Sequence, residues 1–304
     1  ILLYKLYHYG IRGTLFTWFK SYLSERIQFT TVNEVPSRKS QINCGVPQGS
    51  VLGPLLFLIY INDIALANQD LKIRLFADDS NLFVCHKDLT TLFNIANYQI
   101  DCLNEWLIAN KLSINLNKTN YMIFKPTKQL NNDIKNLNLQ IKFNNVIIER
   151  TSCTKYLGIY MDEDLNWQKH IDYVHKKIVK FVGLFHKRRS FLPNDCCKNL
   201  YFAFVHSTIS YGIEIYGNTF QTYLLIIEKT VNKILRILQC KRRRETHVID
   251  LYKTYNTLPV SSLFKLHVLK FVHTFYHNKS KLPIVFHSYF KSNDSIHDHN
   301  TRHK

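Results

Sequence analysis

Two adjacent carboxylates, Asp78 and Asp79, are the side chains with the clearest chemistry in this sequence. Neighbouring carboxylates repel each other, so one of them tends to take up a proton unless a cation compensates the charge. Mg²⁺ suits this role, because it binds one or two carboxylates together with substrate phosphates and keeps water in its other positions. The pair therefore indicates a divalent-metal site, and an ordinary hairpin turn is the alternative.

The flanking segments predict the element that holds this pair. Residues 73–77 and 82–85 are short, mostly apolar and rich in strand formers, and residues 78–81 supply turn formers between them. We therefore expect a β-hairpin with both aspartates at its turn.

A loop rich in glycine and proline, residues 45–54, leads into an apolar segment that is expected to be a helix. Gly45 and Gly49 lack side chains and would leave room for a nucleotide or a template strand. The Gln48 amide can both donate and accept hydrogen bonds, and Ser50 is placed to cap the helix. The alternative is a surface loop that leads into a core helix.

The loop and the hairpin occur in this order, with 29 residues from Gly49 to Asp78, as GVPQGSVLGPLLFLIYIND and LFADDSNLF. Together they resemble motifs B and C of the reverse transcriptases of non-LTR retrotransposons of the jockey and chicken-repeat-like kind. Residues 106–119 and 155–170 are similar to the family's motif D and to the segment that leads into its thumb, and residues 300–302 resemble a recurrent end of such domains. The resemblance covers nearly the whole chain.

The resemblance implies an RNA-directed DNA polymerase of a mobile element, which binds an RNA template, a DNA primer or target and deoxynucleoside triphosphates. It also implies that Asp78 and Asp79 ligate Mg²⁺, with Mn²⁺ as the alternative ion, and that Lys118 protonates the leaving pyrophosphate. The substrate-binding residues implied by the two motifs are Pro47, Gln48, Gly49, Phe76 and Ala77.

One departure from the family concerns the metal site. Family members carry a further metal-binding Asp in motif A, a stretch resembling FxDxxKAFD, ahead of a segment like residues 2–6, and this chain begins at Ile1 inside that segment. We therefore expect an amino-terminally truncated fragment that is inactive or nearly so by itself, because two-metal catalysis needs a clamp on both the attacking and the leaving oxygen. The alternative is a non-catalytic nucleic-acid-binding remnant of a decayed or host-adopted retroelement. An RNA-dependent RNA polymerase or intron maturase shares the twin-Asp hairpin but fits the other motifs less well.

Positive charge is concentrated in the second half of the sequence. The 304 residues carry a formal net charge of +18, with 12 Lys and Arg against 9 Asp and Glu in residues 1–125, and 28 against 13 in residues 126–304. Such a charge favours a nucleic-acid partner, since each neutralised phosphate contributes a salt-dependent share of the affinity. The polymerase interpretation assigns nucleic-acid contact to Lys176, Lys177, Lys180, Arg188, Arg189, Arg242, Arg243 and Arg244.

Simpler explanations exist for the same cations. A basic helix face is usually just solvated, and the run of residues 241–244 also fits a nuclear-import signal or a positive helix end favoured by the helix dipole. The carboxy-terminal His297, His299 and His303 could bind a metal, and a solvated tail is the alternative.

The cysteine pattern and hydropathy bear on the compartment. Seven cysteines without a CxxC pair indicate reduced, intracellular thiols, and we read the adjacent Cys196 and Cys197 as helix packing. The resemblance implies a ribonucleoprotein of the nucleus and cytoplasm. The uncharged residues 40–62 contain an apolar stretch far shorter than the roughly 20 residues of a membrane span, so we expect a buried helix and no membrane association. The sequence leaves the oligomeric state open.

The expected fold is α+β: part of a right-hand polymerase palm (residues 1–125), a connecting hairpin and palm–thumb junction (126–168), and a helical basic thumb with the carboxy-terminal region (169–304). Hydrophobic spacing predicts the individual elements. The expected helices span residues 14–23, 55–61, 89–108, 170–185, 223–238, 251–258 and 260–275. The expected strands span residues 27–32 and 40–44 around a turn at Pro36, 112–116, and a hairpin of 139–143 with 146–149.

Overall fold

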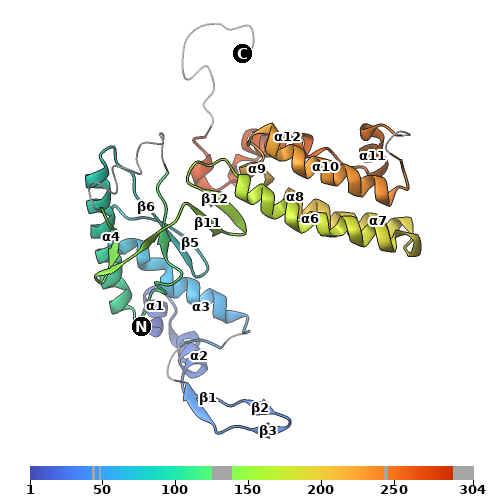
Figure 1. Ribbon diagram of the computed structural model, residues 1–304. Helices are drawn as coiled ribbons and strands as arrows, with labels where there is room; N and C mark the ends of the chain where they lie inside the picture. Colours follow the sequence, from blue (N-terminus) through green and yellow to red (C-terminus); the bar gives the residue numbers. More distant parts are fainter. Residues whose placement is uncertain (43–44, 48, 125–138, 243–245, 290–304) are drawn as a thin grey trace. The chain divides into compact units, whose positions relative to one another are not determined.

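The computed structural model describes residues 1–42, 45–47, 49–124, 139–242 and 246–289 (Figure 1). The chain divides into two compact units. The first comprises residues 1–121 and 125–151, and the second comprises residues 122–124 and 152–304.

The helices of the first unit enclose a small apolar core whose buried side chains are Leu6, Phe19 and Leu56. Gly10 and Gly13 have left-handed backbone conformations (φ 92° and 58°) and turn the chain between the first two helices. The helices of this unit are α1 (Leu2–His8), α2 (Gly13–Leu23), α3 (Leu52–Ile61), the 3-10 helix η1 (Asn62–Ala67) and α4 (Leu89–Ala109).

Helix α4 confirms the prediction for residues 89–108. It begins after Asp88, whose side chain accepts a hydrogen bond of 2.7 Å from the Thr91 amide. That bond lowers the pKa of the Asp88 carboxyl. The side chain thus satisfies one of the amides that every helix leaves unpaired in its first turn.

Among the described residues, the strands of the first unit pair only in two-stranded ladders. All of these ladders are antiparallel except the pairing of β7 with β10. The pairs are β1 (Arg26–Gln28) with β4 (Ser40–Ile42), β2 (Thr31–Val32) with β3 (Val35–Pro36), β5 (Lys72–Phe76) with β6 (Asp79–Phe83), β7 (Asn120–Tyr121) with β10 (Glu149–Arg150), and β8 (Lys142–Phe143) with β9 (Val146–Ile147).

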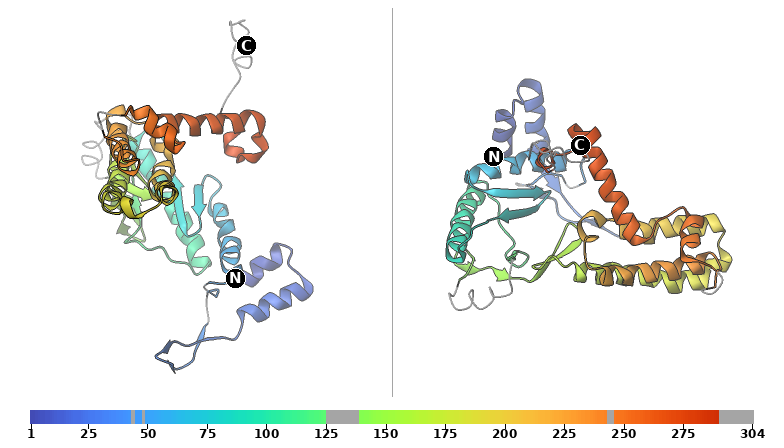
Figure 2. Two further views of the ribbon diagram at one scale, coloured as in Figure 1. Left: turned by 90° about the vertical axis from the view of Figure 1, so that its right-hand side faces the viewer. Right: turned by 90° about the horizontal axis from the view of Figure 1, so that it is seen from above.

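The expected turn at Pro36 was wrong. Pro36 lies in β3 opposite Thr31, and the turn is formed by Asn33 and Glu34, which both have positive φ (46° and 66°). Asn tolerates this region better than most residues do, whereas the fixed φ of proline fits an edge strand. This ribbon extends away from α2 in both Figures 1 and 2.

The expected strand at residues 112–116 was also wrong. These residues form no hydrogen-bonded ladder with any described segment, and residues 116–118 form a turn. Leu112, Ile114 and Leu116 are nevertheless half-buried, with exposed residues between them. The alternation predicted burial correctly, but a period of two does not provide a partner strand.

The second unit is mainly helical and has the larger core. Helices α6 (Gln168–Arg188) and α10 (Gln221–Leu238) lie side by side (Figures 1 and 2) and confirm two of the predicted helices. The remaining elements are β11 (Cys153–Tyr156), β12 (Ile159–Asp162), η2 (Arg189–Phe191), α7 (Asn194–Leu200), the π-helix η3 (Tyr201–His206), α8 (Ser207–Ser210), α9 (Ile213–Tyr216), α11 (Val248–Tyr255), α12 (Val260–His277), η4 (Lys279–Lys281) and η5 (Ile284–Phe286).

The apolar stripe predicted for α6 faces this core. Ile171, Val174 and Ile178 on α6 and Ile227 and Ile234 on α10 are at most 1% exposed. Burial of each such side chain stabilises the fold by roughly 1.5–3 kcal/mol. The charged residues on the surface of α6 and α10 are therefore held by helices that pack on a well-buried core.

Candidate functional site

The hairpin β5–β6 carries Asp78 and Asp79 at its tip. Phe76 pairs with Asp79, so the turn contains only Ala77 and Asp78, and the predicted turn over residues 78–81 was too long. Ala77 has φ 51°, a left-handed conformation that is uncommon for a residue with a side chain. Both aspartates are exposed. Phe76, a predicted substrate contact, is 59% exposed, which leaves most of its ring accessible.

The two carboxylates fit the ligand preference of a hard divalent cation. Neither the Asp78 nor the Asp79 carboxylate forms a hydrogen bond or ion pair with another described residue, so the carboxylate oxygens are open to a ligand. Mg²⁺ takes oxygen ligands and needs few of them from the protein when substrate phosphates complete its shell. In the part of the chain that the structure describes, no group of three or more His, Cys, Asp or Glu side chains is placed to hold a metal.

The loop before α3 is held by its own backbone and by Ser50. Gly45 and Gly49 have positive φ (79° and 80°), and a Cβ atom at either would meet nothing within 4 Å. Glycine is therefore required here by the backbone conformation rather than by crowding within the described residues. Ser50 Oγ donates a hydrogen bond of 2.8 Å to the Pro47 carbonyl and accepts one of 3.0 Å from the Gly53 amide. This second bond gives the Gly53 amide an acceptor in the first turn of α3, although Val51 rather than Ser50 occupies the N-cap position.

Lys118 lies in a turn after the half-buried segment that follows α4 and is exposed. Its amide donates a hydrogen bond of 3.0 Å to the Asn115 carbonyl. No interaction within the described residues joins its side chain to Asp78 or Asp79. Its predicted role in proton transfer thus stays a prediction.

A buried cation ties the helices of the first unit together, and sequence reasoning missed it. The Lys5 ammonium is 2.6 Å from the Tyr60 carbonyl oxygen and 2.6 Å from Oδ1 of Asp63. It also lies 4.8 Å and 5.0 Å from the ring centroids of Tyr60 and Trp106. Lys5 thereby links α1 to the end of α3 and to α4. A charged residue inside the apolar run of residues 2–6 was the available signal.

Hydrogen bonds among residues 160–170 connect β12 to the start of α6 in the second unit. Asp162 is buried, and its two carboxylate oxygens accept hydrogen bonds from the amides of Asn166 (3.0 Å) and Trp167 (2.8 Å). Nδ1 of the buried His170 accepts a bond of 3.2 Å from the Tyr160 amide. These contacts fix the start of α6 against β12.

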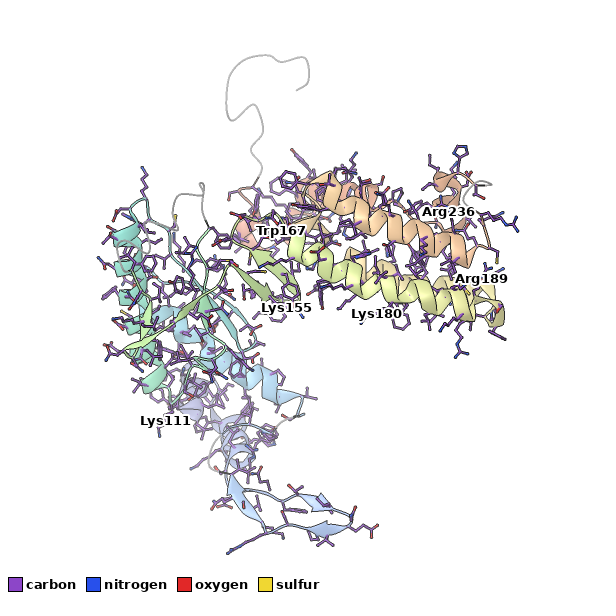
Figure 3. All side chains as sticks on the ribbon, viewed as in Figure 1. Lys111, Lys155, Trp167, Lys180, Arg189 and Arg236 are labelled. Atoms are coloured by element: carbon purple, nitrogen blue, oxygen red, sulfur yellow. The ribbon has the colours of Figure 1, made fainter. Side chains whose placement is uncertain are left out.

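The predicted basic residues of α6 are partly gathered around an aromatic ring. Lys176, Lys177 and Lys180 are exposed. The ammonium groups of Lys177 and Lys155 lie 4.6 Å and 5.1 Å from the ring centroid of Tyr173. The hydrogen bond with Lys177, and then Lys155, lower the pKa of the Tyr173 phenol. Lys155 lies on β11 (Figure 3), and the sequence did not predict its nearness to α6, because that nearness depends on tertiary structure.

The remaining predicted cations lie near the ends of α6 and α10. Arg188 is exposed, and Arg189 donates a hydrogen bond of 2.7 Å from Nη1 to the Ile237 carbonyl at the end of α10. Arg189 and Arg242 line the same concavity in the second unit. Four groups of predicted residues fall outside the described residues: Gln48, Arg243, Arg244 and the carboxy-terminal histidines.

The structure also bears on the predictions for the cysteines and for a membrane span. Cys197 is buried in α7, as expected for a packing role. No helix in the described ranges combines the length and apolar character that a bilayer crossing requires.

Known proteins provide the comparison that geometry alone does not. Residues 1–161 match the family described as reverse transcriptase (RNA-dependent DNA polymerase). The RNA-directed DNA polymerase from mobile element jockey of Drosophila melanogaster is 27% identical over 237 residues, covering 74% of this chain and 24% of that protein. Its counterpart from Drosophila funebris is 28% identical over 242 residues, covering 76% and 25%.

A third relative agrees with these two. The probable RNA-directed DNA polymerase from transposon X-element of Drosophila melanogaster is 26% identical over 253 residues, covering 77% of this chain and 27% of that protein. The chain thus spans about a quarter of the length of the curated relatives it matches. The resemblance to the polymerases of mobile elements is confirmed.

Proposed function

Since the chain belongs to the reverse transcriptase family, we propose that it supplies the carboxylate pair and the basic helical region of a polymerase that copies the RNA of a mobile element into DNA. The single observation that carries this proposal is the β5–β6 hairpin. It presents Asp78 and Asp79 together, exposed and without a described partner. Two adjacent carboxylates repel each other, and a bound cation would compensate that repulsion.

The proposed reaction is in-line attack of a primer 3′ hydroxyl on the α-phosphate of a deoxynucleoside triphosphate, with pyrophosphate leaving. Asp78 and Asp79 would hold Mg²⁺, or Mn²⁺ as the alternative ion, with the direct ligand role assigned first to Asp78. The bound ion supplies positive charge where negative charge develops on the phosphate oxygens. Pro47, Gln48, Gly49, Phe76 and Ala77 would position the nucleotide and template, and Lys118 would donate a proton to the leaving pyrophosphate.

The proposal includes a further carboxylate. Asp78 and Asp79 would be two of three metal-site carboxylates, and the third would come from a segment resembling FxDxxKAFD joined to the residues of this chain. By itself the chain would then extend primers poorly or not at all. The partners would be an RNA template, a DNA primer or target and deoxynucleotides, in a ribonucleoprotein of the nucleus and cytoplasm.

A second candidate, a non-catalytic nucleic-acid-binding protein, is favoured by a different observation. The exposed cations belong to the second unit and the carboxylates to the first, and the cations would hold phosphates without any metal chemistry. The two candidates therefore differ in whether Asp78 matters.

The test is primer extension on an RNA template by a protein in which a segment carrying the FxDxxKAFD motif precedes residue 1. Asp78→Asn is expected to lower the extension rate at least about 10³-fold, since the amide keeps the shape and loses the charge that holds Mg²⁺. Binding of an RNA–DNA hybrid and the melting temperature should stay unchanged. Asp101→Asn removes the same charge from an exposed position on α4 and is the matched control.

Lys118→Ala should slow extension less than Asp78→Asn does, by about 10²-fold at the lower end of the range for a general acid, because water replaces part of its contribution. An Asp78→Asn protein that extends primers as fast as the Asp101→Asn control would refute the metal role. The binding candidate would then remain.

A further inference from the structure

The second unit contains a concavity of about 1040 Å³ whose described lining is strongly basic. It lies where the carboxy-terminal parts of α6 and α10 meet the start of α11. Figure 3 labels Arg189 and Arg236 at this end of the helical unit. Among the described residues that line the concavity, none is acidic. The cations that line it are Arg189, Lys229, Lys233, Arg236, Lys241 and Arg242.

Helix α10 explains why several of these cations converge. Lys229, Lys233 and Arg236 are four and three residues apart, and this spacing puts them on one face of the helix. The hydrogen bond from Arg189 Nη1 to the Ile237 carbonyl, 2.7 Å long, fixes a fourth cation beside them. The positive face of one helix thus becomes one wall of a concave site.

The attraction of cations to the carboxy-terminal end of a helix does not explain this arrangement. The helix dipole attracts cations only within the last turn, so it accounts for Arg236, whereas Lys229 and Lys233 lie further back in α10. Neither of these lysines forms an ion pair with a described residue. Like charges in one concavity repel each other, and an anion would relieve that repulsion.

Arg236 provides a more specific signal. Its Nε is buried without a hydrogen-bond partner among the described residues. An unsatisfied buried donor on a charged group is costly. A turn of the Arg236 side chain toward the concavity that it lines would let a phosphate satisfy the guanidinium, which binds phosphates through two parallel hydrogen bonds.

The residue types in the lining favour contact with the phosphates of a nucleic acid over contact with its bases. Apart from His186 and His247, no described residue that lines the concavity carries an aromatic ring. The site therefore lacks the Phe, Tyr or Trp platforms on which single-stranded bases usually stack. Several cations around one hollow suit closely spaced phosphates, as in a folded RNA strand, better than the regular backbone of a straight duplex.

We propose that this concavity binds the closely spaced phosphates of a folded RNA, separately from the exposed face of α6 that carries Lys176 and Lys180. The inference rests on the proposed function for its nucleic-acid partner. Free polyphosphate offers the same chemistry, so the test must distinguish the two sources.

The test measures the anisotropy of a labelled RNA hairpin and of a labelled RNA–DNA hybrid over a range of salt concentrations. The double variant Lys229→Gln/Lys233→Gln changes two exposed side chains, and equal melting temperatures would verify that it folds. We expect it to weaken hairpin binding about tenfold and to reduce the salt slope by about 1.4, since each of two lost phosphate contacts contributes about 0.7 to the slope with single strands. Hybrid binding should change less than twofold.

Two further variants separate the possible failures. Lys265→Gln/Lys270→Gln removes the same charge from exposed positions on α12 and should leave hairpin binding unchanged. Lys176→Gln/Lys180→Gln should weaken hybrid binding more than hairpin binding. If the original protein binds neither ligand, the proposed function fails. If it binds the hybrid and the Lys229→Gln/Lys233→Gln variant binds the hairpin as well as the α12 control does, this inference alone is overturned.

Inorganic tripolyphosphate is the final probe. Competition with the hairpin in the original protein, lost in the Lys229→Gln/Lys233→Gln variant, supports a phosphate site that RNA occupies. Tripolyphosphate binding that the hairpin does not displace would overturn RNA as the occupant.

Discussion

The hairpins β5–β6 and β11–β12 use the same chemical group in opposite ways. Both are antiparallel with two-residue turns, and both carry aspartates. In β5–β6 the aspartates lie at the tip and are exposed, whereas Asp162 lies at the open end of β11–β12 and is buried. The open end leads into the segment just before α6, where the Asn166 and Trp167 amides need acceptors, and both oxygens of the Asp162 carboxylate accept hydrogen bonds from them. Position within a hairpin thus decides whether a carboxylate stabilises the fold or remains available to a ligand.

The largest expected effect on stability comes from removing the occupied carboxylate. Asp162→Ala leaves the Asn166 and Trp167 amides without their acceptors and should lower the free energy of unfolding by about 2–3 kcal/mol. Urea denaturation followed by circular dichroism measures this change. Asp164→Ala, at an exposed position two residues later, and Asp78→Ala should each stay within about 0.5 kcal/mol of the original protein. Equal losses at Asp162 and Asp164 would contradict the comparison.

A smaller effect is expected at the two turns. Gly158 has φ 85°, and an added Cβ would lie 3.1 Å from Cε1 of Tyr211. Gly158→Ala should therefore cost about 1–2 kcal/mol. Ala77→Gly at the other turn should change stability by less than about 1 kcal/mol and in the stabilising direction, because relief of left-handed strain exceeds the entropy cost of glycine.

The same denaturation series contains a control for these turns. Gly183 lies in α6 with nothing within 4 Å of an added Cβ. Gly183→Ala should stabilise the protein by up to about 1 kcal/mol through helix propensity. If Gly158→Ala were as harmless as Gly183→Ala, the β11–β12 turn would not need its left-handed glycine.

The smallest effect at neutral pH concerns His170. Burial, and then the charge of Lys177, lower the pKa of His170 to about 4. An unfolded chain takes up this proton near pH 6.5, so stability should fall as the pH drops from about 6.5 to about 4 and should be independent of His170 above that range. His170→Asn keeps an acceptor for the Tyr160 amide and removes the titration. Its stability should therefore fall less between pH 6.5 and 4, and identical pH profiles would contradict this assignment.

Sequence reasoning worked best where local pattern and structure coincide. The apolar spacing of α6, α10 and α4 predicted their extents within a few residues. It failed at Pro36 and at residues 112–116, where strand pairing depends on a partner that lies elsewhere in the chain. The candidate site shows the same division. The Asp78–Asp79 pair was predicted from its neighbours in sequence, whereas the nearness of Lys155 to Tyr173 was not.

The sequence by itself determined the family, the long helices α4, α6 and α10, the hairpin with its carboxylate pair and the basic second half, because these depend on residue types, short spacings and recognisable motifs. Only the tertiary structure decided which charged groups are buried with a hydrogen-bond or ion-pair partner and which are exposed. It buried Lys5 beside Asp63 and placed the buried Asp162 carboxylate next to two amides, whereas Asp78 and Asp79 stayed exposed. It also brought Arg189 and Arg236, from two different segments, to the lining of one concavity. Burial and long-range contact set the environment of a charge, and residues far apart in the sequence provide both.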